Sequence, residues 1–109
     1  MQRLGDIDQL IGEVILSYSD GTIICASGRR FEIDIEDDGC GGNDSHAYLD
    51  GSDVGGLYGK VITAAYPKDR SSYGVHLVLE AGDTRGWIQI THEHNGYYGF
   101  SYDVREVKS

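Results

Sequence analysis

The alternation of apolar and polar residues along the chain predicts β-strands. Residues 30–35 (RFEIDI) place apolar side chains on one face and charged ones on the other, which is the period of two that a half-buried strand shows. Residues 73–81 carry valine and leucine on one face and His76, Val78 and Glu80 on the other. The predicted strands are residues 14–18, 22–26, 30–35, 60–66, 73–81, 87–93 and 97–104.

A hairpin is predicted between the last two of these strands. Asn95-Gly96 between two strand-like segments is the strongest short hairpin signal. With a three-residue loop, in which Gly96 takes the left-handed conformation, the apolar and aromatic residues share one face. A two-residue loop would place each aromatic residue opposite a polar one. The predicted pairs are His92 with Tyr98, Ile90 with Phe100, and Ile88 with Tyr102.

Two short helical turns are predicted, each leading into a strand. Residues 6–12 begin with Asp6, which can cap free backbone amides, and end with Gly12, which suits a left-handed cap. Residues 53–62 repeat the pattern of residues 6–15 at an offset of 47 positions. In the second copy, Gly55 and Gly56 each weaken a helix by about 1 kcal/mol relative to alanine. The similarity fits either a duplication or convergence on one helix-to-strand connection.

The remaining segments are predicted to be loops. Glu36 to Tyr48 is rich in acids and glycine, and residues 67–72 (PKDRSS) are polar and contain the one proline. The fold class predicted is mainly β (β-rich α+β), with about seven antiparallel strands in a curved sheet or partly open barrel and one or two helical turns. A length of 109 residues fits a single domain, residues 1–109.

Charge and composition limit the possible partners. The formal net charge of -9 argues against direct binding to nucleic-acid phosphates, which needs a basic surface. No apolar run approaches the roughly 20 residues of a membrane span, and residues 1–6 lack a secretion signal. We therefore expect no membrane contact, a location in the cytosol, and reduced thiols at Cys25 and Cys40. Cys25 is predicted to be a packing residue.

The order of four motifs resembles a family of small bacteriophage-encoded domains of unknown function, common in phages of actinobacteria. The motifs are Leu10-Ile11-Gly12, the acidic segment ending in Cys40, the Leu57-x-Gly59-x-x-Ile62 start, and Asn95-Gly96-Tyr97-Tyr98, which is the most specific. Members often carry two adjacent cysteines and a glutamate in the acidic segment, whereas Cys40 stands alone among glycines here. The resemblance implies a phage origin and a site in the cytosol of the infected bacterium, but no activity.

No assembled catalytic or metal-binding set is recognisable. The segment from Asp34 to Gly39 begins like a calcium-binding loop, but Ser45 replaces the glutamate that should close it. Cys40 and the histidines are ligand types that zinc uses, yet none has CxxC or HxxxH spacing. The sequence therefore favours a binding protein over an enzyme and predicts no catalytic residue, metal ligand or cofactor.

The hairpin end is the predicted ligand site. Tyr97 falls on the polar face, where its ring can stack on a ligand, with hydrogen bonds from Asn95 and His94 and with His92 nearby. Together with the phage resemblance, this predicts an accessory protein of the host cytosol that binds a nucleotide-like signal or a host protein and so antagonises a host defence system. The alternatives are a small metal-dependent hydrolase using histidines and the acidic segment, and an acidic decoy that mimics nucleic acid. An exposed sheet edge also predicts a homo-oligomer.

Overall fold

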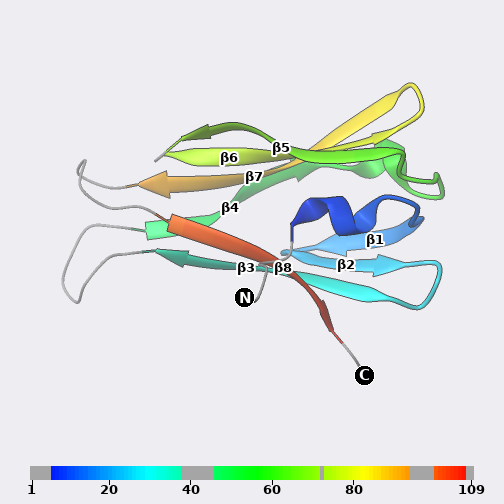
Figure 1. The fold of residues 1–109 in the computed structure, drawn as a ribbon, viewed down its shortest axis with the longest axis horizontal. Helices are drawn as coiled ribbons and strands as arrows, with labels where there is room; N and C mark the ends of the chain where they lie inside the picture. Colours follow the sequence, from blue (N-terminus) through cyan, green and yellow to red (C-terminus); the bar gives the residue numbers. More distant parts are fainter. Residues whose placement is uncertain (1–5, 38–45, 72, 94–99, 108–109) are drawn as a thin grey trace.

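The structure is a computed structural model that describes residues 6–37, 46–71, 73–93 and 100–107. It contains eight strands in two four-stranded antiparallel sheets, which form two layers (Figure 1). The first sheet has the order β1-β2-β3-β8 and the second the order β4-β7-β6-β5. The elements are η1 (Ile7–Leu10), β1 (Ile15–Ser19), β2 (Thr22–Cys25), β3 (Arg30–Asp37), β4 (His46–Asp53), η2 (Gly55–Leu57), β5 (Ala64–Ser71), β6 (Gly74–Ala81), β7 (Thr84–Glu93) and β8 (Phe100–Val107).

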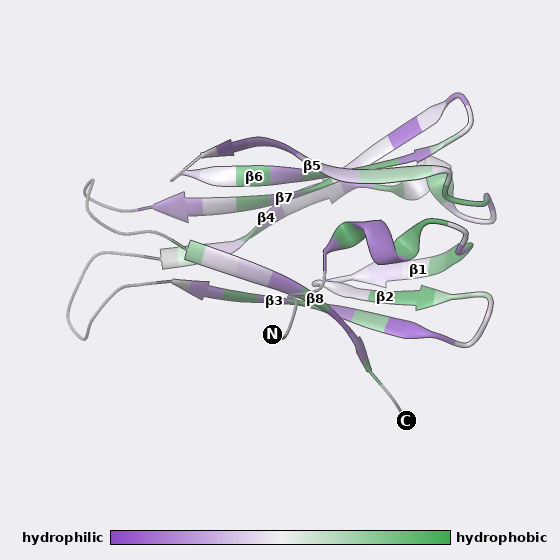
Figure 2. Ribbon diagram, viewed as in Figure 1, coloured by the Kyte–Doolittle hydropathy of each residue, from purple (hydrophilic) through white to green (hydrophobic). Residues whose placement is uncertain are grey.

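The core lies between the two sheets and is formed by the apolar faces that the alternation predicted. Phe31 from the first sheet and Leu77, Ile88 and Ile90 from the second are fully buried in one cluster. Burying each such side chain stabilises the fold by roughly 1.5–3 kcal/mol. The green bands in Figure 2 show this alternation along the strands. Cys25 is also buried, as predicted, and burial raises the pKa of its thiol to about 11.

The two halves of the chain have the same topology. β1, β2 and β3 form a meander in the first sheet, and β4 then crosses to pair with β7 in the second. β5, β6 and β7 form a meander in the second sheet, and β8 crosses back to pair with β3. Each half thus donates its fourth strand to the sheet of the other half.

The sequence repeat lies where the two halves meet. The Gly12 N–H donates to the Ile62 carbonyl at 2.8 Å, and the Gly59 N–H donates to the Ile15 carbonyl at 3.1 Å. Val14 and Val61 form an antiparallel bridge between these bonds. An offset of 47 positions converts each of these contacts into the other, so the similarity found in the sequence corresponds to two equivalent structural units in contact.

The helical turns are 3-10 turns that close one side of the core. Asp6 caps η1 as predicted, because its side chain accepts a hydrogen bond from the Ile7 N–H at 2.6 Å. The same carboxylate accepts from the Tyr102 hydroxyl at 2.8 Å, which ties η1 to β8. Figure 1 shows η1 between the two layers, where it contacts β5.

The predicted pairing of β7 with β8 is wrong. β7 pairs with β4 and β6, and β8 pairs with β3 in the other sheet. The faces were nevertheless predicted correctly, since Ile88, Ile90 and Tyr102 all point into the core. Alternation determines which side of a strand is buried, but it does not determine which strand lies beside it. The predicted loop at Asn95-Gly96 lies outside the described residues.

The class prediction of a mainly β, antiparallel fold is confirmed, but its arrangement is not a single curved sheet or barrel. Two segments predicted as loops contain strand: β3 extends to Asp37, β4 begins at His46, and β5 continues through Pro67 to Ser71. Both β4 and β5 are edge strands, where polar residues and proline are tolerated. The strand predicted from Lys60 begins only at Ala64, because residues 59–62 bond to residues 12–15 instead.

In the described part of the chain, helix is confined to the four residues of η1 and the three of η2, and neither could reach across a lipid bilayer.

Replacing the two equivalent glycines tests the repeat. Gly12 and Gly59 have φ angles of 90° and 81°, and a Cβ atom at either position would meet nothing within 4 Å. Alanine should therefore cost about 1 kcal/mol of unfolding free energy at each site, through backbone strain alone. Urea unfolding measures this cost. Gly55→Ala is the matched control, because Gly55 is equally open but has no positive φ. An equal loss at all three sites would contradict the assigned backbone conformation.

Candidate functional site

The structure buries His92, one of the predicted ligand contacts, in the protein interior. Its side chain is 1% exposed and its ring lies 5.2 Å from that of Phe100. The residue therefore belongs to the interior, as the predicted apolar face implies, and offers no accessible atom to a bound molecule. His94, Asn95 and Tyr97, the other predicted ligand contacts, lie outside the described residues, so their role stays a prediction.

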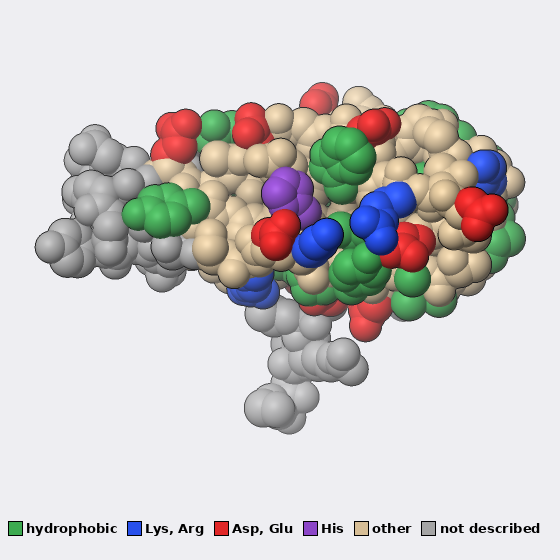
Figure 3. Space-filling view, turned by 90° about the horizontal axis from the view of Figure 1, so that it is seen from above, with side chains coloured by type: hydrophobic (Ala, Val, Ile, Leu, Met, Phe, Trp, Pro, Cys, Tyr) green, Lys and Arg blue, Asp and Glu red, His purple; other side chains and the backbone are tan. Residues whose placement is uncertain are grey.

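A different site lies on the outer face of the second sheet. A groove of about 440 Å³ crosses β5, β6 and β7 there. We call it the β5–β7 groove. Figure 3 looks onto this sheet and shows basic and acidic side chains, a histidine and large hydrophobic side chains gathered around the middle of the face. The groove is lined by Lys68, Asp69, His76, Val78, Arg85, Trp87 and Gln89.

Strand register brings these side chains together. Lys68, His76 and Gln89 are cross-strand partners and form one row across the sheet. Side chains on directly paired residues start about 5 Å apart and so contact one another. This row gives the groove a cation, an imidazole and an amide side by side.

The neighbouring row is apolar. Tyr66, Val78 and Trp87 are cross-strand partners on the same outer face. Val78 is buried between larger neighbours, whereas the indole of Trp87 remains 39% exposed. An apolar row on the solvent face of an antiparallel sheet is unusual, because that face is ordinarily polar. It gives the groove a flat surface on which a ring can stack.

One ion pair and one hydrogen bond hold the side chains at one rim of the groove. Arg85 pairs with Glu80 at 3.2 Å, and the Tyr66 hydroxyl donates to the same carboxylate at 2.5 Å. The Tyr66 hydrogen bond, together with the Arg85 guanidinium, holds the pKa of Glu80 below its ordinary value. The same hydrogen bond raises the pKa of Tyr66. Glu80 therefore stays ionised and orients both side chains.

The other polar side chains of the groove have weaker partners. His76 Nδ1 lies 3.9 Å from an Asp69 carboxylate oxygen, which is at the outer limit of an ion pair. Within the described residues, Lys68 makes no ion pair. The lining holds no serine, threonine or cysteine that a base could activate. This arrangement can bind an anion and a ring.

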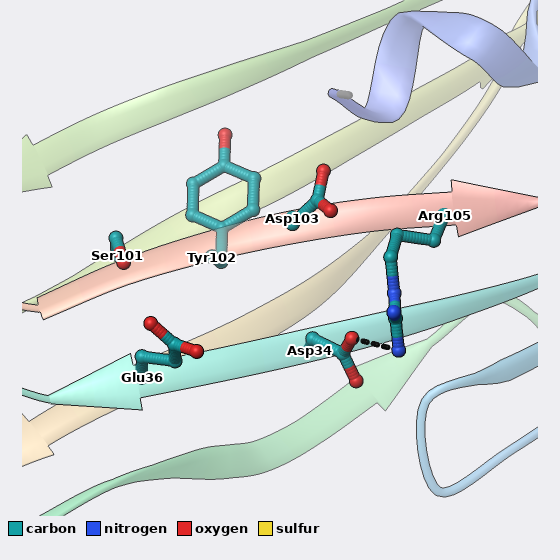
Figure 4. Close-up of a pocket in the computed structure, with 6 residues that line it drawn as sticks. All are labelled: Asp34, Glu36, Ser101, Tyr102, Asp103 and Arg105. Atoms are coloured by element: carbon teal, nitrogen blue, oxygen red, sulfur yellow. Dashed lines mark ion pairs between the residues drawn. The ribbon is translucent and has the colours of Figure 1, made fainter. Parts of the chain in front are cut away.

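The first sheet carries an acidic counterpart. A pocket of about 190 Å³ lies on β3 and β8 and is lined by Asp34, Glu36, Ser101, Tyr102, Asp103 and Arg105 (Figure 4). Asp34 and Asp103 are direct cross-strand partners, and Arg105 pairs with Asp34. Among the residues that the structure describes, no three His, Cys, Asp or Glu side chains are placed to hold a metal ion. The two outer faces thus differ in charge although their strand order is equivalent.

Sequence reasoning missed the groove, although a signal was present. Val78 and Trp87 are apolar residues at positions that alternation assigns to the polar face of their strands. Such misplaced apolar residues indicate a functional surface, but the sequence does not show that β5 brings Lys68 beside them.

Removing the Tyr66 hydroxyl tests the rim. Tyr66→Phe should raise the pKa of Glu80 towards its ordinary value of 4.5. A carboxyl group whose pKa is lower in the folded than in the unfolded state stabilises the fold at any pH above its unfolded-state pKa. That stabilisation is lost as the pH falls through the folded-state pKa. The variant should therefore lose less stability on acidification. NMR titration of the carboxyl carbon measures the pKa, with Tyr58→Phe as the control. An unchanged pKa in Tyr66→Phe would mean that the hydrogen bond does not form in solution.

Comparison with known proteins found no match to this chain among protein-family models, curated proteins or solved structures.

Proposed function

We propose that this chain is a non-catalytic binding protein that holds a small, anionic, ring-containing ligand of nucleotide type in the β5–β7 groove. The observation that carries the proposal is that the exposed indole of Trp87 lines the same groove as Lys68, which makes no ion pair among the described residues. A flat ring and an anionic group within one small ligand match these two features.

The aromatic row supports ring binding. A nucleobase stacked on an aromatic side chain contributes about 1–3 kcal/mol, largely independent of base identity. Trp87 provides that surface, and the buried Val78 beside it supports the indole from the sheet. Gln89 lies in the adjoining row and carries both a donor and an acceptor for a base edge.

The charge distribution favours a small ligand over a nucleic-acid chain. The protein has a formal charge of -9, so a long polyphosphate would be repelled by most of its surface. Lys68, His76 and Arg85 lie on one face, where a ligand with one or two phosphates can contact them without meeting the acidic face of the first sheet.

The phage resemblance supports a biological setting for this binding. A phage accessory protein in the cytosol of an infected bacterium could antagonise a defence system by sequestering a nucleotide-like signal. The predicted contacts at His94, Asn95 and Tyr97 would add to the ligand site if the end of β7 also reaches the ligand.

Titration calorimetry tests the proposal with a panel of nucleoside monophosphates, cyclic dinucleotides and unphosphorylated nucleosides. Trp87→Ala should weaken nucleotide binding at least tenfold, which corresponds to about 1.4 kcal/mol. Lys68→Ala should weaken nucleotides but leave nucleosides unchanged, because it removes only the contact to the anion.

Two controls match these variants. Ile24 has the same exposed fraction as Trp87, 39%, but lies on the outer face of the first sheet, so Ile24→Ala should have no effect. Arg30→Ala removes a cation from that sheet and should likewise leave binding unchanged. Failure of every nucleotide to bind below about 1 mM, or equal losses in variants and controls, would refute the proposal.

A further inference from the structure

Large exposed hydrophobic side chains concentrate at one end of the molecule, away from the β5–β7 groove. The described residues include seven of them, and four come from two short segments: Ile11 (49% exposed), Leu16 (56%), Tyr58 (42%) and Val61 (54%). We call these four the end patch. Isolated exposed apolar residues are normal, but a contiguous group marks an interaction surface.

The two segments of the end patch are held side by side by the repeat. The Ile62 N–H donates to the Glu13 carbonyl at 2.9 Å, and the Gly12 and Gly59 bonds flank this contact. Figure 1 shows both connections, from η1 to β1 and from η2 to β5, at the same end of the two layers. Ile11 and Tyr58 are equivalent in the repeat, and each directly follows the buried leucine of its turn. Backbone hydrogen bonds between the two segments therefore hold the patch together.

We propose that the end patch is the interface through which two copies of this chain form a symmetric dimer. Each copy carries a formal charge of -9, so most faces would repel one another on approach. The end patch is an exception. Its two segments, residues 10–16 and 57–62, contain one acidic residue, Glu13, which is buried.

The buried acid of these segments is paired, and their lysine is hydrogen-bonded. Arg29 and Ser27 both bind the Glu13 carboxylate, at 2.5 Å and 2.7 Å. The Lys60 ammonium donates to the Thr84 hydroxyl at 2.8 Å. The surface left is formed by the four exposed apolar side chains, with Lys60 as the one exposed charged residue of the two segments, so it carries none of the negative charge that repels a second copy elsewhere.

In a twofold dimer, the same patch of both copies forms the interface. An apolar patch can pack against its own copy, whereas a patch with many charges of one sign repels its copy. β1, which contributes Leu16, is an edge strand of the first sheet, and within the described residues the junction with residues 59–62 covers that edge only as far as Ile15. A second copy would cover the rest of that edge as well as the patch.

Analytical ultracentrifugation of the full chain tests the proposal at protein concentrations up to about 100 µM, well above a micromolar Kd. The wild type should sediment at twice the 12.0 kDa of one chain. Val61→Glu should sediment as a monomer with an unchanged circular dichroism spectrum. A dimer of this variant would bury two unpaired carboxylates, one from each copy, at the interface. Ile11→Glu, at a separate point of the patch, provides a second variant if the first does not fold.

Tyr73→Glu is the matched control. Tyr73 is 60% exposed, but it lies between β5 and β6, outside the patch. It should remain dimeric. A monomeric wild type at every concentration would overturn the proposal, as would a dimer that survives both patch variants. A wild-type monomer that binds another protein or lipid vesicles through Val61 would also overturn it, and would assign the patch to that partner. None of these outcomes depends on a nucleotide binding in the groove.

Discussion

The backbone junction between residues 12–15 and 59–62 is the constraint on which the rest of the architecture depends. It joins the segment that leads into β1 of the first sheet to the segment that leads into β5 of the second. Since both segments follow a tight turn that buries its leucine, Leu10 or Leu57, the junction anchors each turn in the core. The two sheets are thereby held at one side by backbone hydrogen bonds, while their apolar faces close over the core.

The reciprocal exchange of β4 and β8 holds the sheets together elsewhere. Each crossing strand forms a full ladder with a strand of the opposite half, β4 with β7 and β8 with β3. Separating the halves would therefore break two ladders and expose the core at once. The hydrogen bond from Tyr102 to Asp6 adds a link between β8 and the first turn of the chain. This interlocking gives a chain of modest apolar content a single cooperative core.

Equivalent topology leaves the two outer faces free to differ. The face on β3 and β8 carries opposed carboxylates, Asp34 and Asp103, whereas the face on β5, β6 and β7 carries the Trp87 row and the cations of the groove. Outward residues contribute little to the core, so their chemistry can change without loss of the fold. The proposed ligand site and the proposed dimer interface occupy separate surfaces. The ligand site lies on the outer face of the second sheet, and the dimer interface lies at the junction of the repeat.

The strand class, the buried face of most strands, the capped turn at Asp6 and the repeat at an offset of 47 could all be predicted from the amino-acid sequence. These are local properties, set by side-chain alternation and by turn chemistry within a few residues. Three features could be seen only in the folded chain: β7 and β8 belong to different sheets, the polar segments at β4 and β5 are edge strands, and Lys68, His76 and Trp87 line one groove. Strand pairing depends on how apolar faces that are distant in the sequence bury one another. The residues of one strand therefore do not identify the strand that pairs with it.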